Sequence, residues 1–135
     1  KVGLIADPLV VLLPRKRGNS PAYRTFVVDQ SESEFPPGSY QLINFSPYPV
    51  RCRVGGRSAL SASGTVQKLQ PIDVPGKMMS VEFEYHDGER WRRMTTTRWA
   101  YRNDRRSLLY LDPADKRMKL RSIPDRVITP ATATR

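Results

Sequence analysis

The sequence is poor in the residues on which most catalytic and metal sites depend. It has one histidine and one cysteine, which excludes a disulfide within the chain and zinc sites of the Cys₄ or Cys₂His₂ type. It contains no Gly-x-Ser-x-Gly nucleophile elbow, no phosphate loop ending in Lys-Ser/Thr and no Asp-x-Asp-x-Asp-Gly calcium loop. We therefore expect no catalytic residues, no cofactor and no metal, and we predict that the protein is not an enzyme.

Long apolar runs and helical periodicity are also missing. The longest apolar stretch, Leu9 to Leu13, is far shorter than the roughly 18 residues that a transmembrane helix needs, so we expect no membrane span. The chain has 12 prolines and 8 glycines, and they interrupt it every few positions. Almost no window keeps the apolar recurrence of a helix. These absences favour an all-β fold.

The single histidine and the single cysteine can both be explained by structural roles, without a catalytic one. His86 lies at an expected hairpin tip beside Asp87, where a polar turn residue is ordinary. Cys52 alternates with Val50 and Val54 in the segment VRCRV. Because side chains alternate between the two faces of a strand, this pattern predicts a buried thiol and not an exposed nucleophile.

Short apolar or alternating runs bounded by turn residues are what the sequence has in abundance, and such runs are typical of β-strands. They predict an all-β fold, an antiparallel β-sandwich of about seven to nine short strands with little or no helix. We expect a single domain over residues 1–125 and a flexible C-terminal tail over 126–135. The expected strands are 10–13, 24–28, 40–45, 50–54, 66–69, 78–85, 90–99, 107–111 and 116–123.

One hairpin can be predicted in detail. In MSVEFEY the inward residues are expected to be Met79, Val81, Phe83 and Tyr85, and the outward ones Ser80, Glu82 and Glu84. The next residues, His-Asp-Gly, fit a three-residue loop in which Gly88 takes positive φ. This loop sets Glu84 opposite Arg90 and Glu82 opposite Arg92. Neighbouring arginines would keep both glutamates ionised, which argues against a pair of acids for glycoside hydrolysis.

Basic residues exceed acidic ones, 23 to 13, which gives a formal charge of +10. Arginine outnumbers lysine 17 to 6, and the planar guanidinium suits bidentate contact with phosphate, sulfate or carboxylate. The basic residues are densest between positions 90 and 106. Such a surplus is compatible with a solvated basic face and with an anionic partner, and the sequence leaves both open.

Arginines and aromatic residues alternate in the segment 89–106, ERWRRMTTTRWAYRNDRR. This combination is used by surfaces on which bases or sugar rings stack, because aromatic faces supply area and guanidinium groups supply charge. In a sandwich, the same tryptophans can instead lie in the core with the arginines outward. The arginines would bind an anion provided that they share one exposed face. The predicted ligand-binding residues are Arg90, Trp91, Arg92, Arg93, Arg98, Trp99 and Tyr101.

Residues 35–56, FPPGSYQLINFSPYPVRCRVGG, join a Pro-Gly-x-Tyr phrase that starts a strand to an Asn-x-Ser segment that leads to a second strand. This stretch resembles the opening of small immunoglobulin-like or prealbumin-like β-sandwich domains of secreted bacterial proteins. The resemblance covers 22 of 135 residues. It implies an extracytoplasmic location, secreted or periplasmic, and an accessory, carbohydrate-contacting or assembly role. A first residue other than methionine is compatible with removal of a secretion signal.

Three functions follow as hypotheses. The first is a non-enzymatic module that binds or scaffolds through its Arg/Trp-rich basic surface, with an anionic polysaccharide or an envelope component as partner. The second is a nucleic-acid-binding β-barrel, whose binding would fall steeply with salt. The third is a structural or assembly subunit that uses an exposed strand edge, with the segment Val2 to Leu13 donated to a neighbour. The oligomeric state is left open.

Overall fold

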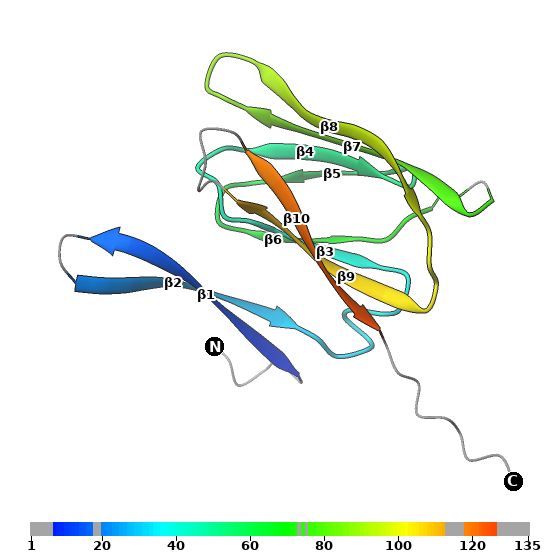
Figure 1. Cartoon of the computed structure of the whole chain (residues 1–135), viewed down its shortest axis with the longest axis horizontal. Coiled ribbons are helices and arrows are strands. Elements are labelled where there is room, and N and C mark those ends of the chain that lie inside the picture. The colour runs from blue at the N-terminus through cyan, green and yellow to red at the C-terminus, as the bar shows by residue number, and fades with distance from the viewer. Residues whose placement is uncertain (1–6, 18–19, 73, 75, 113–117, 127–135) are drawn as a thin grey trace, which may run out of the picture. The chain divides into compact units, whose positions relative to one another are not determined.

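The computed structural model describes residues 7–17, 20–72, 74, 76–112 and 118–126. Over these ranges the chain forms ten β-strands and no helix, which confirms the all-β prediction (Figure 1). No helix that could cross a membrane is found in the same ranges. The strands are β1 Pro8–Arg17, β2 Ser20–Asp29, β3 Tyr40–Asn44, β4 Val50–Val54, β5 Arg57–Ser61, β6 Val66–Leu69, β7 Met78–His86, β8 Trp91–Ala100, β9 Arg105–Asp112 and β10 Lys119–Arg126.

The chain divides into two compact units, Lys1–Pro36 and Pro37–Arg135, where the sequence predicts one domain over 1–125. The first unit contains the antiparallel hairpin of β1 and β2, in which Val11 pairs with Phe26. The described part of the segment expected to be donated to a neighbour therefore lies in β1 and pairs within its own chain. Val10, Leu12 and Tyr23 are exposed on this hairpin.

The second unit is a β-sandwich of two four-stranded sheets. Their strand orders are β10-β9-β3-β6 and β5-β4-β7-β8. All neighbours are antiparallel except β3 and β9, which run parallel with Tyr40 opposite Ser107 and Asn44 opposite Leu111. A parallel pair needs a long crossover, and here the crossover passes through the other sheet. The wholly antiparallel arrangement expected from the sequence is therefore wrong at this one pair.

The core lies between the two sheets and follows the alternation of the sequence. In β4, Val50, Cys52 and Val54 are buried while the arginines between them are exposed. In β7 the inward set is also as predicted, with Tyr85 half-buried at its end. The buried cluster consists of Leu42, Val50, Cys52, Val54, Leu69, Met79, Val81, Phe83, Leu109 and Leu111. Apolar burial of this kind is the main stabilising contribution to a small domain.

A buried polar corner carries the chain from β3 in one sheet to β4 in the other. The side-chain amide of Asn44 donates to the carbonyl oxygens of Tyr48 (2.8 Å) and Ser61 (3.0 Å). The hydroxyl of Ser46 donates to Asn44 Oδ1 at 2.6 Å. Both side chains are fully buried. The Asn-x-Ser segment is thus the hydrogen-bonded centre of the corner, because a chain leaving a sheet must pair its backbone groups elsewhere.

Strand β5 is absent from the sequence-based prediction. Its only large apolar side chain, Leu60, is 64 % exposed, so the segment RSALS lacks a clear alternating pattern. The missed signal is Gly55-Gly56, which has φ values of 51° and 76° and joins Val54 to its partner Arg57. Two residues with positive φ form the tight turn typical of a two-residue hairpin.

The predicted register of the β7–β8 hairpin is wrong. The structure pairs His86 with Trp91 and Glu84 with Arg93, and a bulge follows between Phe83 and Glu84. The loop has four residues, because Asp87 Oδ1 accepts hydrogen bonds from the backbone N–H groups of Glu89 and Arg90, each at 2.9 Å. An aspartate that caps its own turn in this way stabilises the longer loop.

The last strand partly confirms the prediction. In and just before β10, Met118 and Leu120 pack against the core, whereas Lys119 and Arg121 are exposed, as the alternation predicts. Residues 116 and 117 of the expected strand 116–123 lie outside the described residues. Of the expected tail, Arg126 is the last residue of β10, and 127–135 lie outside the described residues.

Candidate anion-binding site

Strand β8 does not place the predicted ligand-binding residues on one face. Arg93 and Arg98 pair with Glu84 and Ser80 on the outer face of their sheet, whereas Trp99 pairs with the buried Met79 on the inner face. The bulge changes the alternation along the strand. Arg92 pairs with Tyr85 of the inward-facing set, and Arg90 precedes the strand. The condition that the four predicted arginines share one exposed face is therefore not met.

The aromatic residues of this stretch are also divided. The ring of Trp99 lies 5.8 Å from that of Tyr40 and 6.4 Å from that of Phe83, between centroids, and Tyr101 packs against the same core. Trp91 instead lies on the outer face, where the guanidinium carbon of Arg51 is 4.3 Å from its ring centroid. Of the two tryptophans in this segment, Trp99 thus packs against the core, as one alternative in the sequence analysis expects, and Trp91 does not.

The β7–β8 loop engages the side chain of one predicted arginine and the backbone of another. Arg92 Nε donates a hydrogen bond to Asp87 Oδ2 at 2.5 Å. The backbone N–H of Arg90 donates a hydrogen bond to the other carboxylate oxygen, Asp87 Oδ1. Hydrogen bonds from the backbone of Arg90, the side chain of Arg92 and the backbone of Glu89, in that order, hold the pKa of Asp87 well below its usual range. The guanidinium of Arg92 is therefore already paired.

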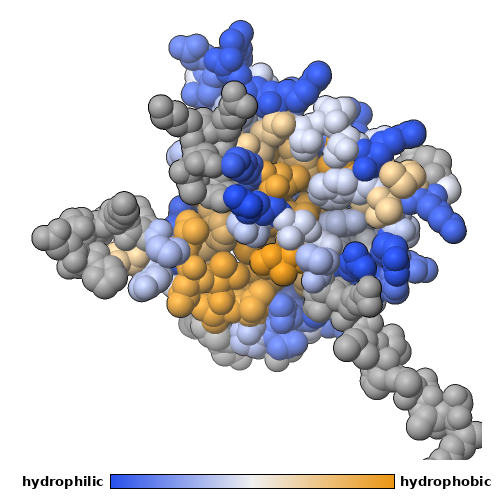
Figure 2. All heavy atoms as spheres, viewed as in Figure 1, coloured by the Kyte–Doolittle hydropathy of each residue, from blue (hydrophilic) through white to orange (hydrophobic). Residues whose placement is uncertain are grey.

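The outer face of the β5-β4-β7-β8 sheet carries charges of both signs. Arg51 forms an ion pair with Glu84, and this replaces the predicted pairing of Glu84 with Arg90. A hollow of about 640 Å³ on this face is lined by Arg51, Cys52, Arg53, Ser58, Ala59, Leu60, Glu82 and Glu84. Hydrophilic residues also gather where the β7–β8 turn ends the sandwich (Figure 2). The two glutamates offset the arginines here, so the hollow is a weak site for an anion.

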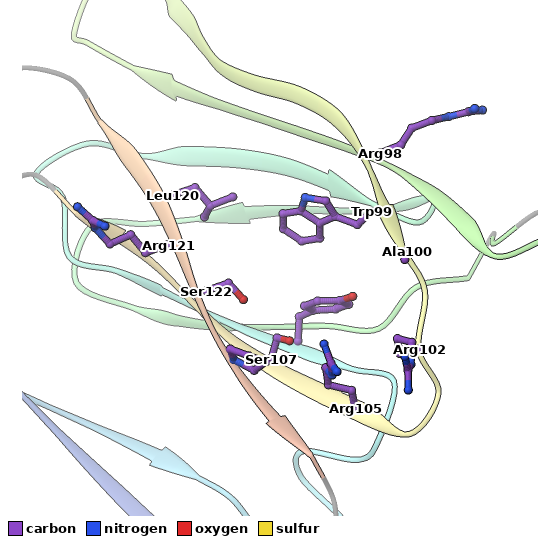
Figure 3. Close-up of a pocket in the computed structure, with 11 residues that line it drawn as sticks. Arg98, Trp99, Ala100, Arg102, Arg105, Ser107, Leu120, Arg121 and Ser122 are labelled. Atoms are coloured by element: carbon purple, nitrogen blue, oxygen red, sulfur yellow. The ribbon is translucent and has the colours of Figure 1, made fainter.

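A second pocket, here called the edge pocket, has a different charge. It lies between the edge strands β8 and β10 of the two sheets, has a volume of about 600 Å³, and is drawn in Figure 3. Among the described residues that line it, four are arginines and none is acidic. The lining residues are Tyr40, Arg98, Trp99, Ala100, Arg102, Arg105, Ser107, Leu120, Arg121, Ser122 and Pro124.

Arg102 and Arg105 differ in how they are paired. Arg102 forms a fork with Asp104, with Nε–Oδ1 and Nη2–Oδ2 distances of 3.0 and 2.9 Å. This fork is the main reason that the pKa of Asp104 falls to about 2. Arg105 Nε is buried and has no hydrogen-bond acceptor among the described residues. Arg105 therefore brings positive charge into the pocket without a partner for that nitrogen.

Tyr40 lines the same pocket from β3. Burial, and to a lesser extent the neighbouring Tyr101, raises the pKa of its phenol, while the charge of Arg105 opposes the shift. The phenol is thus a neutral hydroxyl at physiological pH, able both to donate and to accept a hydrogen bond.

Most of this pocket was not predicted. Among its described lining residues, Arg98 and Trp99 are the only ones predicted to bind a ligand. The residues of β10 join it because Ser122 pairs with Leu109 and Leu120 with Leu111 beside β3. No local sequence signal places β10 next to the end of β8, since the two strands belong to different sheets.

Comparison with known proteins does not name a function. No protein-family model, curated protein or solved structure matches the chain. Within the described ranges, no group of three or more His, Cys, Asp or Glu side chains is placed to hold a metal ion. The geometry of the edge pocket is therefore the basis for a functional proposal.

Proposed function

We propose that this protein is a non-enzymatic β-sandwich module that binds an anionic polysaccharide, or another anionic envelope component, through the arginines of the edge pocket. One observation carries the proposal: among the described residues that line the pocket none is acidic and four are arginines, of which Arg102, Arg105 and Arg121 remain when Arg98, whose side chain extends away from the pocket, is set aside (Figure 3). Guanidinium groups bind carboxylate and sulfate in a planar, bidentate manner. The sequence predicts a basic surface along the whole of β8. The proposed surface instead comprises the end of β8, the turn that follows it and β10.

The charge distribution supports this choice of surface. On the outer face of the β5-β4-β7-β8 sheet, Glu82 and Glu84 lie among the arginines, so an approaching anion meets charges of both signs. Beside the edge pocket, Arg102 already binds the carboxylate of Asp104. A formal charge of +10 also favours encounter with anionic partners at long range.

The extracytoplasmic location is part of the same proposal and rests on the resemblance of residues 35–56. Within that stretch, Asn44 and Ser46 form the buried corner between the sheets. A structural role for these two residues fits an immunoglobulin-like or prealbumin-like domain of secreted bacterial proteins. Such domains are suited to contact carbohydrate or to scaffold without covalent chemistry.

The test measures retention on immobilised heparin and on single-stranded DNA at about 50 and about 200 mM salt. The parent is compared with a variant in which Arg102, Arg105 and Arg121 are changed to Gln. A matched variant changes three exposed arginines that do not line the edge pocket, namely Arg53, Arg57 and Arg93. Both variants lose the same formal charge, so a difference between them reports the place of binding.

We expect salt-sensitive retention of the parent on heparin, lost in the pocket variant and largely kept in the matched variant. Equal loss in both variants would show that net charge alone is responsible, and a parent that elutes at about 50 mM salt would refute the proposal. Retention on DNA that is as tight as on heparin, and is lost in the pocket variant, would favour the nucleic-acid alternative.

A further inference from the structure

We infer that the edge pocket binds one acidic sugar unit, a uronate, with its carboxylate at Arg105 and its ring against Trp99. This inference rests on the proposed function and narrows it, because it names the unit of the polymer that the pocket recognises. Three sets of lining groups carry it: an unpaired cation, an apolar wall and a group of hydroxyls.

The cation is at one end of the pocket. Figure 3 shows Arg102 and Arg105 together at this end, while the side chain of Arg98 extends away from the pocket. The guanidinium of Arg102 forms an ion pair with Asp104. At this end of the pocket, Arg105 is therefore the arginine whose guanidinium is not paired with a carboxylate. Because its Nε is enclosed, a ligand oxygen would meet the terminal nitrogens. A carboxylate there forms charge-assisted hydrogen bonds, which are stronger than neutral ones.

The wall of the pocket is apolar. Trp99 and Tyr40 line it from different sheets, with Leu120, Ala100 and Pro124 completing the surface. The indole of Trp99 is half-buried and packs near the rings of Tyr40 and Phe83. A rigid aromatic face of this kind offers contact area to the C–H face of a sugar ring at little entropic cost.

The hydroxyls come from three strands. Ser107 of β9 and Ser122 of β10 lie beside the pocket in Figure 3, and the phenol of Tyr40 adds a third group from β3. Hydroxyl groups donate and accept hydrogen bonds, which matches the hydroxyls around a sugar ring. A simple carboxylate lacks the ring and a neutral sugar lacks the charge, so the pocket would prefer a ligand that has both. A volume of about 600 Å³ lies within the usual range for small-ligand sites.

The test uses the full chain with Trp91→Phe, so that Trp99 is the one remaining tryptophan of the two. Trp91 does not line the pocket. Sodium glucuronate, glucose and sodium acetate are titrated at equal ionic strength while Trp99 fluorescence is recorded. We expect a saturable change with glucuronate and binding at least about tenfold weaker for glucose and for acetate, because each lacks one of the two contacts.

Two variants in the same background locate the site. Arg105→Gln is expected to weaken glucuronate binding by about tenfold or more, since it removes a charge-assisted contact. Arg93→Gln removes an equal charge from the outer face of the sheet and is expected to leave the affinity unchanged. If Arg105→Gln fails to fold by circular dichroism, Ser122→Ala at an exposed position replaces it, and it should weaken glucuronate binding but not acetate binding.

The outcomes separate this inference from the broader proposal. The absence of a saturable response to glucuronate, equal binding of acetate, or an unchanged affinity in Arg105→Gln would each overturn the uronate site. If heparin retention still depends on the edge arginines in that case, the proposed function stands and only the uronate inference is wrong. If heparin retention is independent of these arginines, both are wrong.

Discussion

Gly38 lies so close to Tyr101 that a Cβ at position 38 would come within 2.6 Å of the phenolic oxygen. Gly38 has a φ of +82°, and its N–H donates to the carbonyl oxygen of Arg105 at 2.8 Å. The turn before β3 is thereby held against the two ends of the 101–105 turn. Tyr101, one of the predicted ligand-binding residues, thus has a packing role beside the edge pocket.

Gly38→Ala is expected to destabilise the protein by about 1–3 kcal/mol, because it adds both backbone strain and a clash with Tyr101. The matched variant is Gly88→Ala, since Gly88 has a φ of +103° but no atom within 4 Å of a Cβ built there. Gly88→Ala should lower the free energy of unfolding by less than Gly38→Ala does, because it adds backbone strain but no clash. Urea unfolding measures both, and equal losses would show that the contact with Tyr101 is unimportant. Tyr101→Phe should recover part of the Gly38→Ala loss.

Asn44→Ala is expected to cost about 2–4 kcal/mol of unfolding free energy, because several buried polar groups lose a partner together. These are the carbonyl oxygens of Tyr48 and Ser61 and the N–H and hydroxyl of Ser46. Ser58→Ala, at an exposed position of β5, is the control and should lie within about 0.5 kcal/mol of the parent. A similar effect of the two substitutions in urea unfolding would contradict the role of the corner.

The stability of the β7–β8 loop should depend on pH through Asp87. Its pKa is lower in the folded protein than the roughly 3.9 of an unfolded chain. The stabilisation is therefore present above that unfolded value and is lost as the pH falls below it. We expect Asp87→Asn to lower the melting temperature at pH 7, with a difference from the parent that shrinks between about pH 5 and about pH 2. A difference that stays constant over this range would show that the charge of Asp87 is irrelevant.

Cys52 should react with iodoacetamide only when the protein unfolds. Cys52 is 5 % exposed, and burial raises the pKa of its thiol to about 11, although a hydrogen bond from the backbone of Ala59 opposes the shift. At pH 8 only about one thiol in a thousand is then the reactive thiolate. Mass spectrometry should show slow modification in buffer and rapid modification in denaturing urea. Rapid modification of the native protein would place the thiol at the surface and contradict the core assignment.

Strand identity was predictable wherever one face of a strand is buried. In β4 and β7 the apolar residues occupy every second position, and these are the positions that are buried. In β5 the sequence shows no such period, because this edge strand buries little besides Ser61. The glycine pair before it was the available signal. Prediction from pattern therefore worked for the central strands and also for the edge strands β6, β8 and β10, and it failed at the edge strand β5, where no apolar period marks the segment.

Register and pairing were less predictable, for a physical reason. Glu84 needs a cationic partner, and the sequence offers Arg90 nearby, but the structure supplies Arg51 from the neighbouring strand β4. Both pairings satisfy the same local electrostatics. The capped turn at Asp87 sets the hairpin register, and the order of strands in the sheet then selects the partner.

The sequence by itself determined an all-β protein with a buried cysteine and a surplus of arginine, because alternation, turn residues and composition are local properties. Only the tertiary structure decided which arginines act together. Arg105 and Trp99 lie in different sheets, and the residues of β10 meet them because β9 pairs with both β3 and β10. A pocket between two sheets depends on strand order, and strand order is determined by the packing of the whole core and not by any one segment.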